Sequence, residues 1–482
     1  MTRRFLLALL ALGLCLKTTA TSAAGPLRAG AFAQDISPTK FPVSVNGSMN
    51  GGFATSITDP MHARCLALHD GKTEILFCVV DACLIPLDIC EKAKEIASKK
   101  TAVPASHMMI SATHTHSAAA LGAAFQCDPD PEYVATVPAR IAEGLIKAHE
   151  NLEAAELGWG FGHEPGQVFN RRWRVKEQEA YENPFGIMTD RAWMNPGAQN
   201  PKISIPAGPV DPDVAVLAVR AVSDKRPLAL MANYSLHYVG GKAAISADYF
   251  AAFADEMAAR LQATDARYQG KPAFVGIMSN GTSGDINNVN FGSPIRLKRQ
   301  PGEQIQIVAR AVADAAMAAY DTLKWEPQTI LAAKEAVLQL GVRKADAAGL
   351  TQARQILEAT LKNKDGVWTD RKAIYARETV KLADYPDTVP VKLQAYRIGE
   401  LSVATIPCEV FVEIGLELKL DTPFRRHFTV SLANGYNGYL PTPKHHQLGG
   451  YETWRARSSY LEVDASTKIV EKLKVMLAGM RE

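Results

Sequence analysis

Short apolar runs alternate with segments of helical apolar spacing through most of this 482-residue chain. Apolar runs of four to eight residues bounded by turn residues predict strands, and apolar residues that recur every three or four positions predict helices. The strands are expected at residues 75–80, 108–112, 156–160, 214–222, 228–234, 274–278, 392–397, 401–406 and 428–432. The helices are expected at residues 88–99, 131–150, 248–262, 303–323, 345–362, 369–382, 410–420 and 465–479. This alternation indicates an α/β fold.

Two segments depart from the alternation. Residues 173–213 are rich in Pro, Asn and Gly and show little periodicity, so a long loop is expected there. Loops of this length are usually functional or disordered. Residues 345–384 are rich in Ala, Lys and Glu and predict a helical hairpin inserted into the domain. Neither segment requires a domain boundary, and we expect one large globular unit.

Residues 1–24 have the pattern of a secretory signal peptide. Two arginines precede a short apolar core at residues 5–16, and Ser22-Ala23-Ala24 offers a cleavage site. The apolar core is too short to span a bilayer, and no later stretch reaches the length of a membrane helix. We therefore expect a mature domain of residues 25–482 that is periplasmic or secreted and has no transmembrane anchor.

The composition narrows the classes of function. The formal net charge is +3, and no basic stripe or run of aromatic residues with arginine is present, so nucleic-acid binding is not expected. Six cysteines follow the signal segment without a CxxC pair, which argues against a cysteine-based zinc site. An even number permits disulfides in an exported protein. Cys65, Cys78 and Cys83 lie inside apolar runs, as small buried hydrophobic residues do, and no pairing is assigned.

The segment Thr113-His114-Thr115-His116-Ser117 carries the clearest chemical signal, directly after the strand expected at residues 108–112. Histidines spaced i, i+2 at the end of a strand project from one face of the sheet. Neutral imidazole binds zinc and can also transfer protons near neutral pH. The pair therefore indicates half of a metal site or an acid–base pair, and the alternative is two solvated histidines in a turn.

Polar residues also follow the other apolar strands, where α/β proteins commonly place their sites. The segments that follow these strands contain His237, Gly284, Asp285, Asn287, Glu409, Asn434, Tyr436, Tyr439, His445, His446 and Tyr451. Each has an ordinary structural explanation when taken alone: His237 could be a hydrogen-bonded core histidine, and Glu409 could stabilise a helix N-terminus. Their repeated placement at strand ends favours one convergent site.

The order of these motifs resembles that of the neutral/alkaline (non-lysosomal) ceramidase family. The resemblance extends from Gly30-Ala-Phe-Ala-Gln-Asp-Ile-Ser37 to about Tyr451, through His-Thr-His-Ser, Asn-Arg, a strand-end His, Gly-Asp-Ile, Pro-x-Glu and Gly-Tyr-Glu. Members of that family are exported zinc-dependent amidohydrolases that split the N-acyl bond of ceramide. Their catalytic domain has stacked mixed β-sheets flanked by helices, and the resemblance implies the same architecture here, in a single large catalytic domain.

The resemblance also implies roles for individual residues. It places the zinc ligands on His114, His237, Glu409 and Tyr439. His116 would lie beside the metal as the general base and would later donate a proton to the leaving amine. Arg171 and Tyr451 would polarise or hold the oxyanion.

Two departures from the family pattern change the expected chemistry. Asn287 occupies the position of the family's active-site serine, and an amide cannot act as a nucleophile, although it can position water or donate to an oxyanion. The family's C-terminal immunoglobulin-like domain is expected to be missing, because the chain ends soon after Tyr451. We therefore expect a zinc-dependent hydrolase that uses zinc-activated water to cleave the amide (N-acyl) bond of a small-molecule or lipid substrate.

Two alternatives stay open. One is hydrolysis of another amide or of an ester derived from sugars or cell-wall fragments, with residues 173–213 and 345–384 lining a polar pocket. The other is a non-catalytic exported binding protein that kept the fold, which the amide at Asn287 favours. The metal content of the protein distinguishes the binding protein from the two hydrolases. A screen for hydrolysis products of N-acyl amides and of esters distinguishes the two hydrolases from each other.

Overall fold

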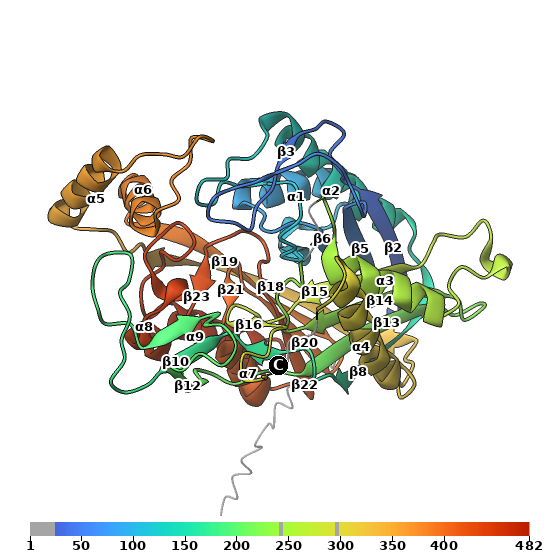
Figure 1. Ribbon diagram of the computed structural model, residues 1–482. Coiled ribbons are helices and arrows are strands. Elements are labelled where there is room, and N and C mark those ends of the chain that lie inside the picture. The colour runs from blue at the N-terminus through green and yellow to red at the C-terminus, as the bar shows by residue number, and fades with distance from the viewer. Residues whose placement is uncertain (1–24, 241–243, 295–297, 482) are drawn as a thin grey trace, which may run out of the picture.

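The computed structural model describes residues 25–240, 244–294 and 298–481. The expected signal peptide at residues 1–24 lies outside this part of the chain. Figure 1 shows two central sheets with helices packed around them and a helical hairpin that projects to one side.

The larger sheet is mixed and has eight strands. In chain order they are β2 (Arg28–Asp35), β5 (His62–His69), β6 (Glu74–Val80), β7 (Met108–Ala112), β8 (Glu153–His163), β13 (Asp213–Ala221), β14 (Pro227–Tyr234) and β15 (Val275–Asn280). Their order in the sheet is β15-β14-β13-β8-β2-β5-β6-β7. The pairs β6–β7 and β14–β15 are parallel, and the other pairs are antiparallel. The two edge strands also meet, because the side chain of Asn280 donates to the carbonyl of Thr113 at 3.1 Å.

The smaller sheet packs on the inner face of the larger one. Its strands, in order, are β18 (Leu331–Gly341), β19 (Thr388–Ile398), β20 (Leu401–Thr405) and β22 (Arg426–Val430). Apolar side chains of both sheets form one buried core. Phe77 of β6 and Tyr396 of β19 meet there edge to face, with ring centroids 5.0 Å apart. This is a favourable arrangement for two aromatic rings, so the pair joins the two sheets directly.

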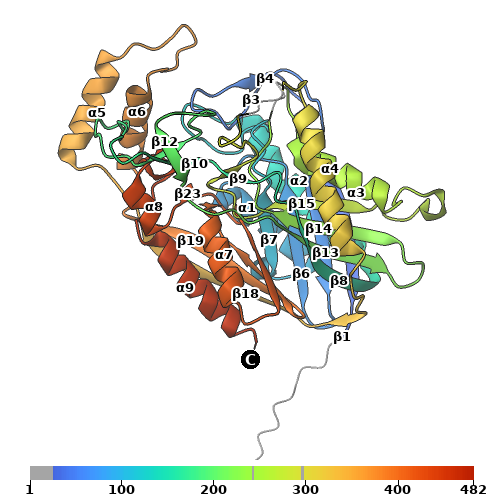
Figure 2. The same cartoon turned by 60° about the horizontal axis from the view of Figure 1, so that its bottom comes forward.

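Helices cover the outer faces of both sheets, as expected. On the larger sheet lie α1 (Leu87–Thr101), α2 (Pro131–Glu150), α3 (Asp248–Arg260) and α4 (Glu303–Tyr320), and on the smaller sheet lie α7 (Val412–Asp421) and α9 (Ala465–Ala478). In Figure 2, α7 and α9 lie on one side of the molecule and α3 and α4 on the other, with the strands between them. Each helix buries an apolar stripe against its sheet. The expected α/β architecture of stacked sheets flanked by helices in a single domain is confirmed.

The expected helical hairpin is formed by α5 (Ala347–Ala359) and α6 (Arg371–Ala383). Aspartate side chains begin both helices: Asp346 accepts from the amide of Gly349, and Asp370 accepts from the amide of Ala373. Such caps satisfy amides that have no partner within the helix. The hairpin projects from the body at the upper left of Figure 1.

The remaining elements are short. They are β1 (Gly25–Pro26), β3 (Val43–Ser44), β4 (Phe53–Ala54), β9 (Phe169–Asn170), β10 (Arg172–Val175), β11 (Ala192–Met194), β12 (Ile203–Pro206), β16 (Ile286–Asn287), β17 (Gln328–Thr329), β21 (Glu409–Val410), β23 (Tyr439–Leu440), α8 (Pro443–Leu448), η1 (Ala105–His107), η2 (Ala266–Tyr268) and η3 (Tyr451–Thr453). The expectation of an unstructured loop at residues 173–213 is wrong in part, because β10, β11 and β12 form a small sheet there. Strands of three or four residues are too short to show an alternating pattern.

No described helix is long and apolar enough to cross a membrane.

Every cysteine in the described part of the chain is buried and free, so none of them forms a disulfide: Cys65, Cys78, Cys83, Cys90, Cys127 and Cys408.

We expect Phe77→Ala to lower the free energy of unfolding by roughly 3–5 kcal/mol, because it removes a buried ring between the two sheets. Leu420→Ala on α7 is the control, since Leu420 is 85% exposed and its loss should change the stability by no more than about 0.5 kcal/mol. Urea denaturation followed by circular dichroism measures both variants. Equal effects would contradict a tightly packed interface between the sheets.

Candidate active site

The four predicted zinc ligands come together where strands of both sheets end. His114 follows β7 and His237 follows β14, both in the larger sheet. Glu409 lies on β21, after β20, and Tyr439 lies on β23, after β22. The short strands β21 and β23 pair in parallel, with Glu409 opposite Tyr439. Each sheet therefore contributes two of the four residues.

His114, His237 and Glu409 form a compact buried group. The Nε2 atoms of the two histidines lie 3.0 Å apart. The Oε2 atom of Glu409 lies 3.2 Å from Nε2 of His114 and 3.9 Å from Nε2 of His237. None of the three side chains is more than 4% exposed. Three atoms that can bind a metal thus converge on one buried point.

The other ring nitrogen of each histidine is fixed by the backbone. Nδ1 of His114 lies 2.6 Å from the carbonyl oxygen of Cys83, and Nδ1 of His237 lies 3.0 Å from that of Ser283. A carbonyl can only accept, so each Nδ1 carries a proton, and in its neutral form each ring has a lone pair on Nε2. His114 also has a backbone φ of 72°, in the left-handed region that non-glycine residues rarely adopt. Backbone strain of this kind clusters at functional sites.

This arrangement fits a zinc ion. The Nε2 atoms of His114 and His237 face each other, and Oε2 of Glu409 is a buried carboxylate oxygen that has no hydrogen-bond partner among the described residues. Buried acceptors that face one another are unfavourable unless a proton or a metal cation lies between them. Two histidines and one carboxylate form a known ligand set of catalytic zinc sites.

The electrostatics of the group favour a positive charge at the same point. Burial lowers the pKa of His114, but the charge of Glu409 outweighs burial and raises this pKa well above its usual value. Burial raises the pKa of Glu409, yet His114 outweighs it and holds the pKa below the usual value, so Glu409 is ionised. Burial also lowers the pKa of His237 and of His116 well below the usual range, which keeps both rings neutral, with a lone pair free to bind a metal.

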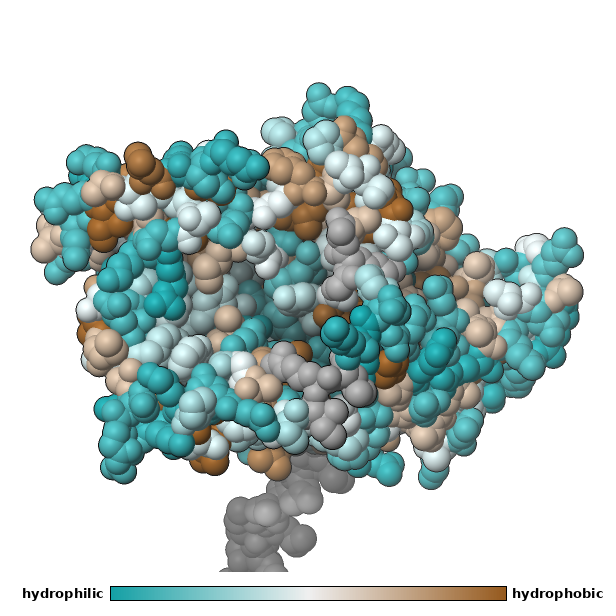
Figure 3. Space-filling view, in the orientation of Figure 1, coloured by the Kyte–Doolittle hydropathy of each residue, from teal (hydrophilic) through white to brown (hydrophobic). Residues whose placement is uncertain are grey.

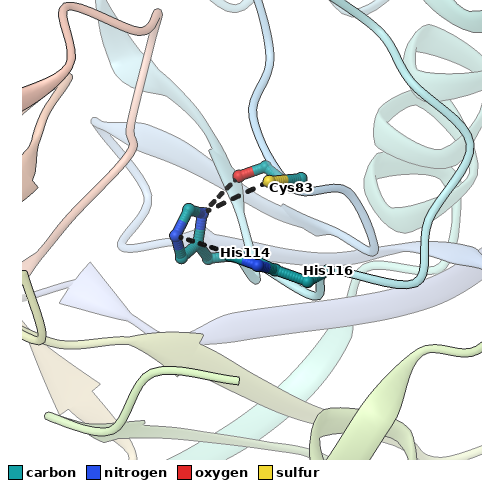
Figure 4. A group of neighbouring side chains, drawn as sticks. All are labelled: Cys83, His114 and His116. Carbon is teal, nitrogen blue, oxygen red and sulfur yellow. Dashed lines mark hydrogen bonds between the residues drawn. The ribbon is translucent and has the colours of Figure 1, made fainter. Parts of the chain in front are cut away.

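Cys83, His114 and His116 form a second group within ligand distance, shown in Figure 4. The Sγ atom of Cys83 lies 3.8 Å from Nδ1 of His114. That nitrogen, however, already donates to the carbonyl of the same cysteine. Nε2 of His116 lies 3.2 Å from Nε2 of His114. Of the two groups, the one that contains Glu409 is therefore the better fit for a metal ion, with His116 beside it.

Arg171 lies next to the histidine and carboxylate group. Its Nη2 atom donates to the hydroxyl of Tyr439 at 3.1 Å and to the carbonyl of Gly284 at 2.8 Å. Its Nη1 atom lies 3.3 Å from Nε2 of His237. The guanidinium is buried, and these contacts hold it in one orientation against the predicted metal ligands.

Glu452 is an important residue that the sequence pattern did not single out. It is fully buried and accepts from Nε of Arg171 at 3.0 Å and from Nη1 of Arg172 at 2.5 Å. Burial raises the pKa of Glu452, but the two arginines outweigh burial and hold it below the usual value, so the carboxylate balances their charge. The available signal was its position in the Gly-Tyr-Glu motif, next to Tyr451.

Three tyrosines surround Glu409. Tyr436 donates to Oε1 of Glu409 at 2.9 Å. The rings of Tyr439 and Tyr451 meet edge to face with centroids 5.7 Å apart. Burial, reinforced by Glu409, raises the pKa of Tyr439 and of Tyr451 above the usual value, so both are neutral hydrogen-bond donors.

His116 is held at the edge of the group. Its ring stacks on Tyr238, with centroids 3.7 Å apart and planes at 14°. Its Nδ1 atom lies 3.1 Å from the carbonyl oxygen of Gly47, so Nε2 carries the lone pair and faces His114. Gly47 has φ 110°, and a Cβ there would lie 2.5 Å from the His116 ring. Glycine at this position is therefore required to seat the ring.

Asn287 lies away from the converging residues. It pairs with Phe169 across β16 and β9, and its Nδ2 atom donates to Oδ1 of Asn195 at 2.8 Å. Asn195 lines the central cavity, whereas Asn287 does not. His445 also lies elsewhere, buried against Phe411. Of the predicted catalytic residues, the structure brings His116, Arg171 and Tyr451 to the ligand group, and Asn287 touches the cavity only through its neighbour.

A cavity of about 220 Å³ opens above the group. Its lining includes Met49, Cys83, His114, His116, Phe125, Arg171, Met194, Asn195, Glu409, Tyr439, Tyr451 and Ser458. In Figure 3 the visible face is hollowed near its centre, and the surface around the hollow is mostly hydrophilic or intermediate in colour. The segment at residues 173–213 contributes Met194 and Asn195, so it does form part of the cavity wall.

No protein-family model and no curated protein sequence matches the chain. Solved structures do match. The neutral ceramidase from Pseudomonas aeruginosa superposes with a TM-score of 0.69 at 14% identity, over 95% of this chain and 75% of that chain. A ceramidase complexed with C2 superposes with a TM-score of 0.66 at 15% identity and the same coverage. The fold is that of the neutral ceramidases. An identity this low shows a shared fold and leaves the chemistry to the residues of the site.

We expect the protein to hold about one zinc ion per chain and His114→Ala to lose it, because that change removes one of the convergent Nε2 atoms. His163→Ala is the matched control, since the His163 side chain is 64% exposed on β8 and should not affect the metal. Elemental analysis of the purified proteins, with circular dichroism to verify folding, measures the effect. Equal zinc in all three proteins, or none in the wild type, would rule out the assigned position.

Proposed function

We propose that this protein is a zinc-dependent amidohydrolase that cleaves the N-acyl bond of its substrate, as a ceramidase-like enzyme. The observation that carries the proposal is the convergence of Nε2 of His114, Nε2 of His237 and Oε2 of Glu409, beside a cavity that His114 and Glu409 line. The neutral ceramidase fold supports the same class of reaction. Tyr439 is the proposed fourth ligand, since it lies opposite Glu409.

The residues around the metal position suit a carbonyl that gains negative charge. Bound zinc would supply Lewis-acid polarisation of the scissile carbonyl and would lower the pKa of water to about 7. The guanidinium of Arg171 and the hydroxyl of Tyr451 both line the cavity and would donate to the developing oxyanion. Arg171 is preorganised for this role, because Gly284 and Glu452 fix its position before substrate binds.

His116 is the proposed group for proton transfer. Its Nδ1 atom is tied to the carbonyl of Gly47, which leaves Nε2 as the atom that takes a proton from water. The same atom would then pass the proton to the nitrogen of the leaving amine. Stacking on Tyr238 keeps the ring in place between these two steps.

Water is the proposed nucleophile. Asn287 replaces the family's serine and cannot attack a carbonyl, and its side chain contacts Asn195 instead of lining the cavity. The role proposed for Asn287 is indirect: it orients Asn195, which can hold water or the oxyanion.

The proposed location is the periplasm or the cell exterior, with the expected signal peptide at residues 1–24 removed. The proposed substrates are small-molecule or lipid amides, as in sphingolipid metabolism. The polar part of the cavity wall, with Ser48, Asn195 and Ser458, also favours a second candidate: another amide or an ester derived from sugars or the cell wall. A screen of zinc-loaded protein on N-acyl sphingosine, N-acetylated sugars and the matching esters distinguishes the two.

We expect His116→Ala to keep its zinc and to lose turnover by roughly 10²–10⁴-fold, the usual contribution of a positioned proton-transfer group. The kcat on an N-acyl amide and the zinc content of the same preparation are the two measurements. If His116→Ala instead loses zinc and His114→Ala keeps it, the roles of the two histidines are exchanged.

We expect Asn287→Ala to lower kcat by less than about tenfold and Asn287→Ser to be tolerated, because the side chain acts only through Asn195. No covalent acyl-enzyme should accumulate. Intact-protein mass spectrometry after quenching the reaction at low pH tests this point. An acyl adduct would identify a side-chain nucleophile, with Ser48, Cys83 and Ser458 as the cavity-lining candidates, and would exclude direct attack by water.

A further inference from the structure

A second cavity adjoins the first. It has a volume of about 320 Å³ and shares Gly47, Ser48, His116 and Tyr238 with the first cavity. The stacked rings of His116 and Tyr238 therefore stand at the boundary between the two spaces. We call the first cavity, which contains Glu409, the metal lobe, and the second, which contains Gly51, Gly52 and Phe53, the glycine lobe.

The two lobes are lined by different side chains. In the metal lobe, Met49, Phe125 and Tyr451 form an apolar wall that continues into an aromatic cluster behind it. The glycine lobe is lined by glycine backbone and small polar side chains such as Asn46 and Ser117, with Val45 and Phe53 among its apolar members. Apolar surface is stabilised by burial against an apolar wall, whereas hydroxyl and amine groups need polar partners.

The proposed roles of the reacting groups fix the direction in which a substrate lies, and this step rests on the proposed function. Arg171 and Tyr451 line the metal lobe alone, so the carbonyl carbon and its acyl group belong there. His116, which would protonate the leaving nitrogen, lies on the boundary. The amine part of the substrate therefore extends past His116 into the glycine lobe.

Phe125 limits the space that remains for the acyl group. The metal lobe is partly open to solvent; since a cavity of about 150 Å³ holds one benzene ring, its 220 Å³ holds on the order of nine non-hydrogen atoms, those of the carbonyl group included. The Phe125 side chain is 6% exposed in the wall, and its backbone has φ 47°, a strained value for a non-glycine residue. Arg377 and Arg457 fix this conformation by donating to its carbonyl at 2.5 and 2.6 Å. These two contacts hold Phe125 in place in the wall of the metal lobe.

The loop that carries Phe125 is fixed from a second side. The side chain of Gln126 donates to the carbonyl of Trp368 at 2.8 Å and accepts from the amide of Trp368 at 2.8 Å. Trp368 lies between α5 and α6. The helical hairpin therefore braces the apolar wall of the metal lobe.

We propose that Phe125 sets the acyl length and that the substrates are N-acyl amides with a short acyl group and a polar amine part, in place of long-chain ceramides. The test is a series of N-acyl ethanolamines with acetyl, butanoyl, hexanoyl, octanoyl and hexadecanoyl groups. In the wild type, kcat/KM should fall about tenfold or more from hexanoyl to octanoyl, and further for hexadecanoyl. Phe125→Ala should raise the octanoyl-to-butanoyl ratio of kcat/KM about tenfold.

Phe53→Ala is the matched control, because it makes the same change in the glycine lobe and should leave the acyl preference unaltered. Phe125→Gly is the second variant, since glycine adopts φ 47° without strain and should fold even if alanine does not. It should show the same shift as Phe125→Ala. A wild type that prefers hexadecanoyl, or a ratio that neither variant moves, overturns the assignment of Phe125.

Binding of hexanoate and octanoate, measured by calorimetry on the zinc-loaded protein, gives a readout without turnover. The wild type should bind hexanoate more tightly, and Phe125→Ala should reverse the order. Absence of hydrolysis across the whole series overturns the proposed function, whereas carboxylate affinities that do not respond to Phe125 overturn the acyl-length assignment alone. The two failures are therefore distinguishable.

Discussion

The contact between the inner faces of the two sheets brings the site together. Hydrogen bonds connect the sheets at the edge where the site lies: the amide of Ala112 donates to the carbonyl of Leu432 at 3.1 Å, and the amide of Asn434 donates to the carbonyl of Ile110 at 2.7 Å. These bonds join the end of β7 to the segment after β22. His114 follows β7, and Tyr439 follows the segment after β22. The packing of the two sheets through their apolar core therefore sets the distance between these two residues, which are far apart in the sequence. A shift of one sheet would separate the ligand atoms.

Most of the fold could be predicted from apolar periodicity, and the errors have physical causes. Every strand inferred from a buried apolar run is present, since burial on both faces leaves a continuous run. β18 was missed because Leu331–Gly341 consists mostly of Ala, Leu, Lys, Glu and Gln, residues that favour helices. Pairing with β19 along its whole length overrides that preference. β2 and β5 were missed because Gly, Ala and His interrupt their apolar pattern. Pairing with strands elsewhere in the chain determines the secondary structure of such segments, and a single sequence does not show that pairing.

Only some residues of the candidate site could be singled out from the sequence. The strand-end positions of His114, His237 and Glu409 pointed to convergence, and the family resemblance supplied their roles. Phe125 carried no such signal, and Glu452 carried only its position in the Gly-Tyr-Glu motif. Glu452 matters only because the fold places Arg171 and Arg172 on both of its oxygens. Phe125 matters because of a backbone conformation and two carbonyl contacts, and neither of these can be inferred from the residue type.

The balance of buried charge links the packing to the proposed chemistry. Arg171 and Arg172 carry two positive charges, and Glu409 and Glu452 carry two negative ones, so the four groups are neutral together. A divalent cation at the ligand group would make the base of the cavity positive, in a buried environment where Coulomb interactions are stronger than in water. Negative charge that develops on a carbonyl oxygen would be stabilised there. A side-chain nucleophile is not needed for that stabilisation. An asparagine at position 287 is therefore compatible with hydrolysis, provided that His116 moves the protons and Arg171 stays in place.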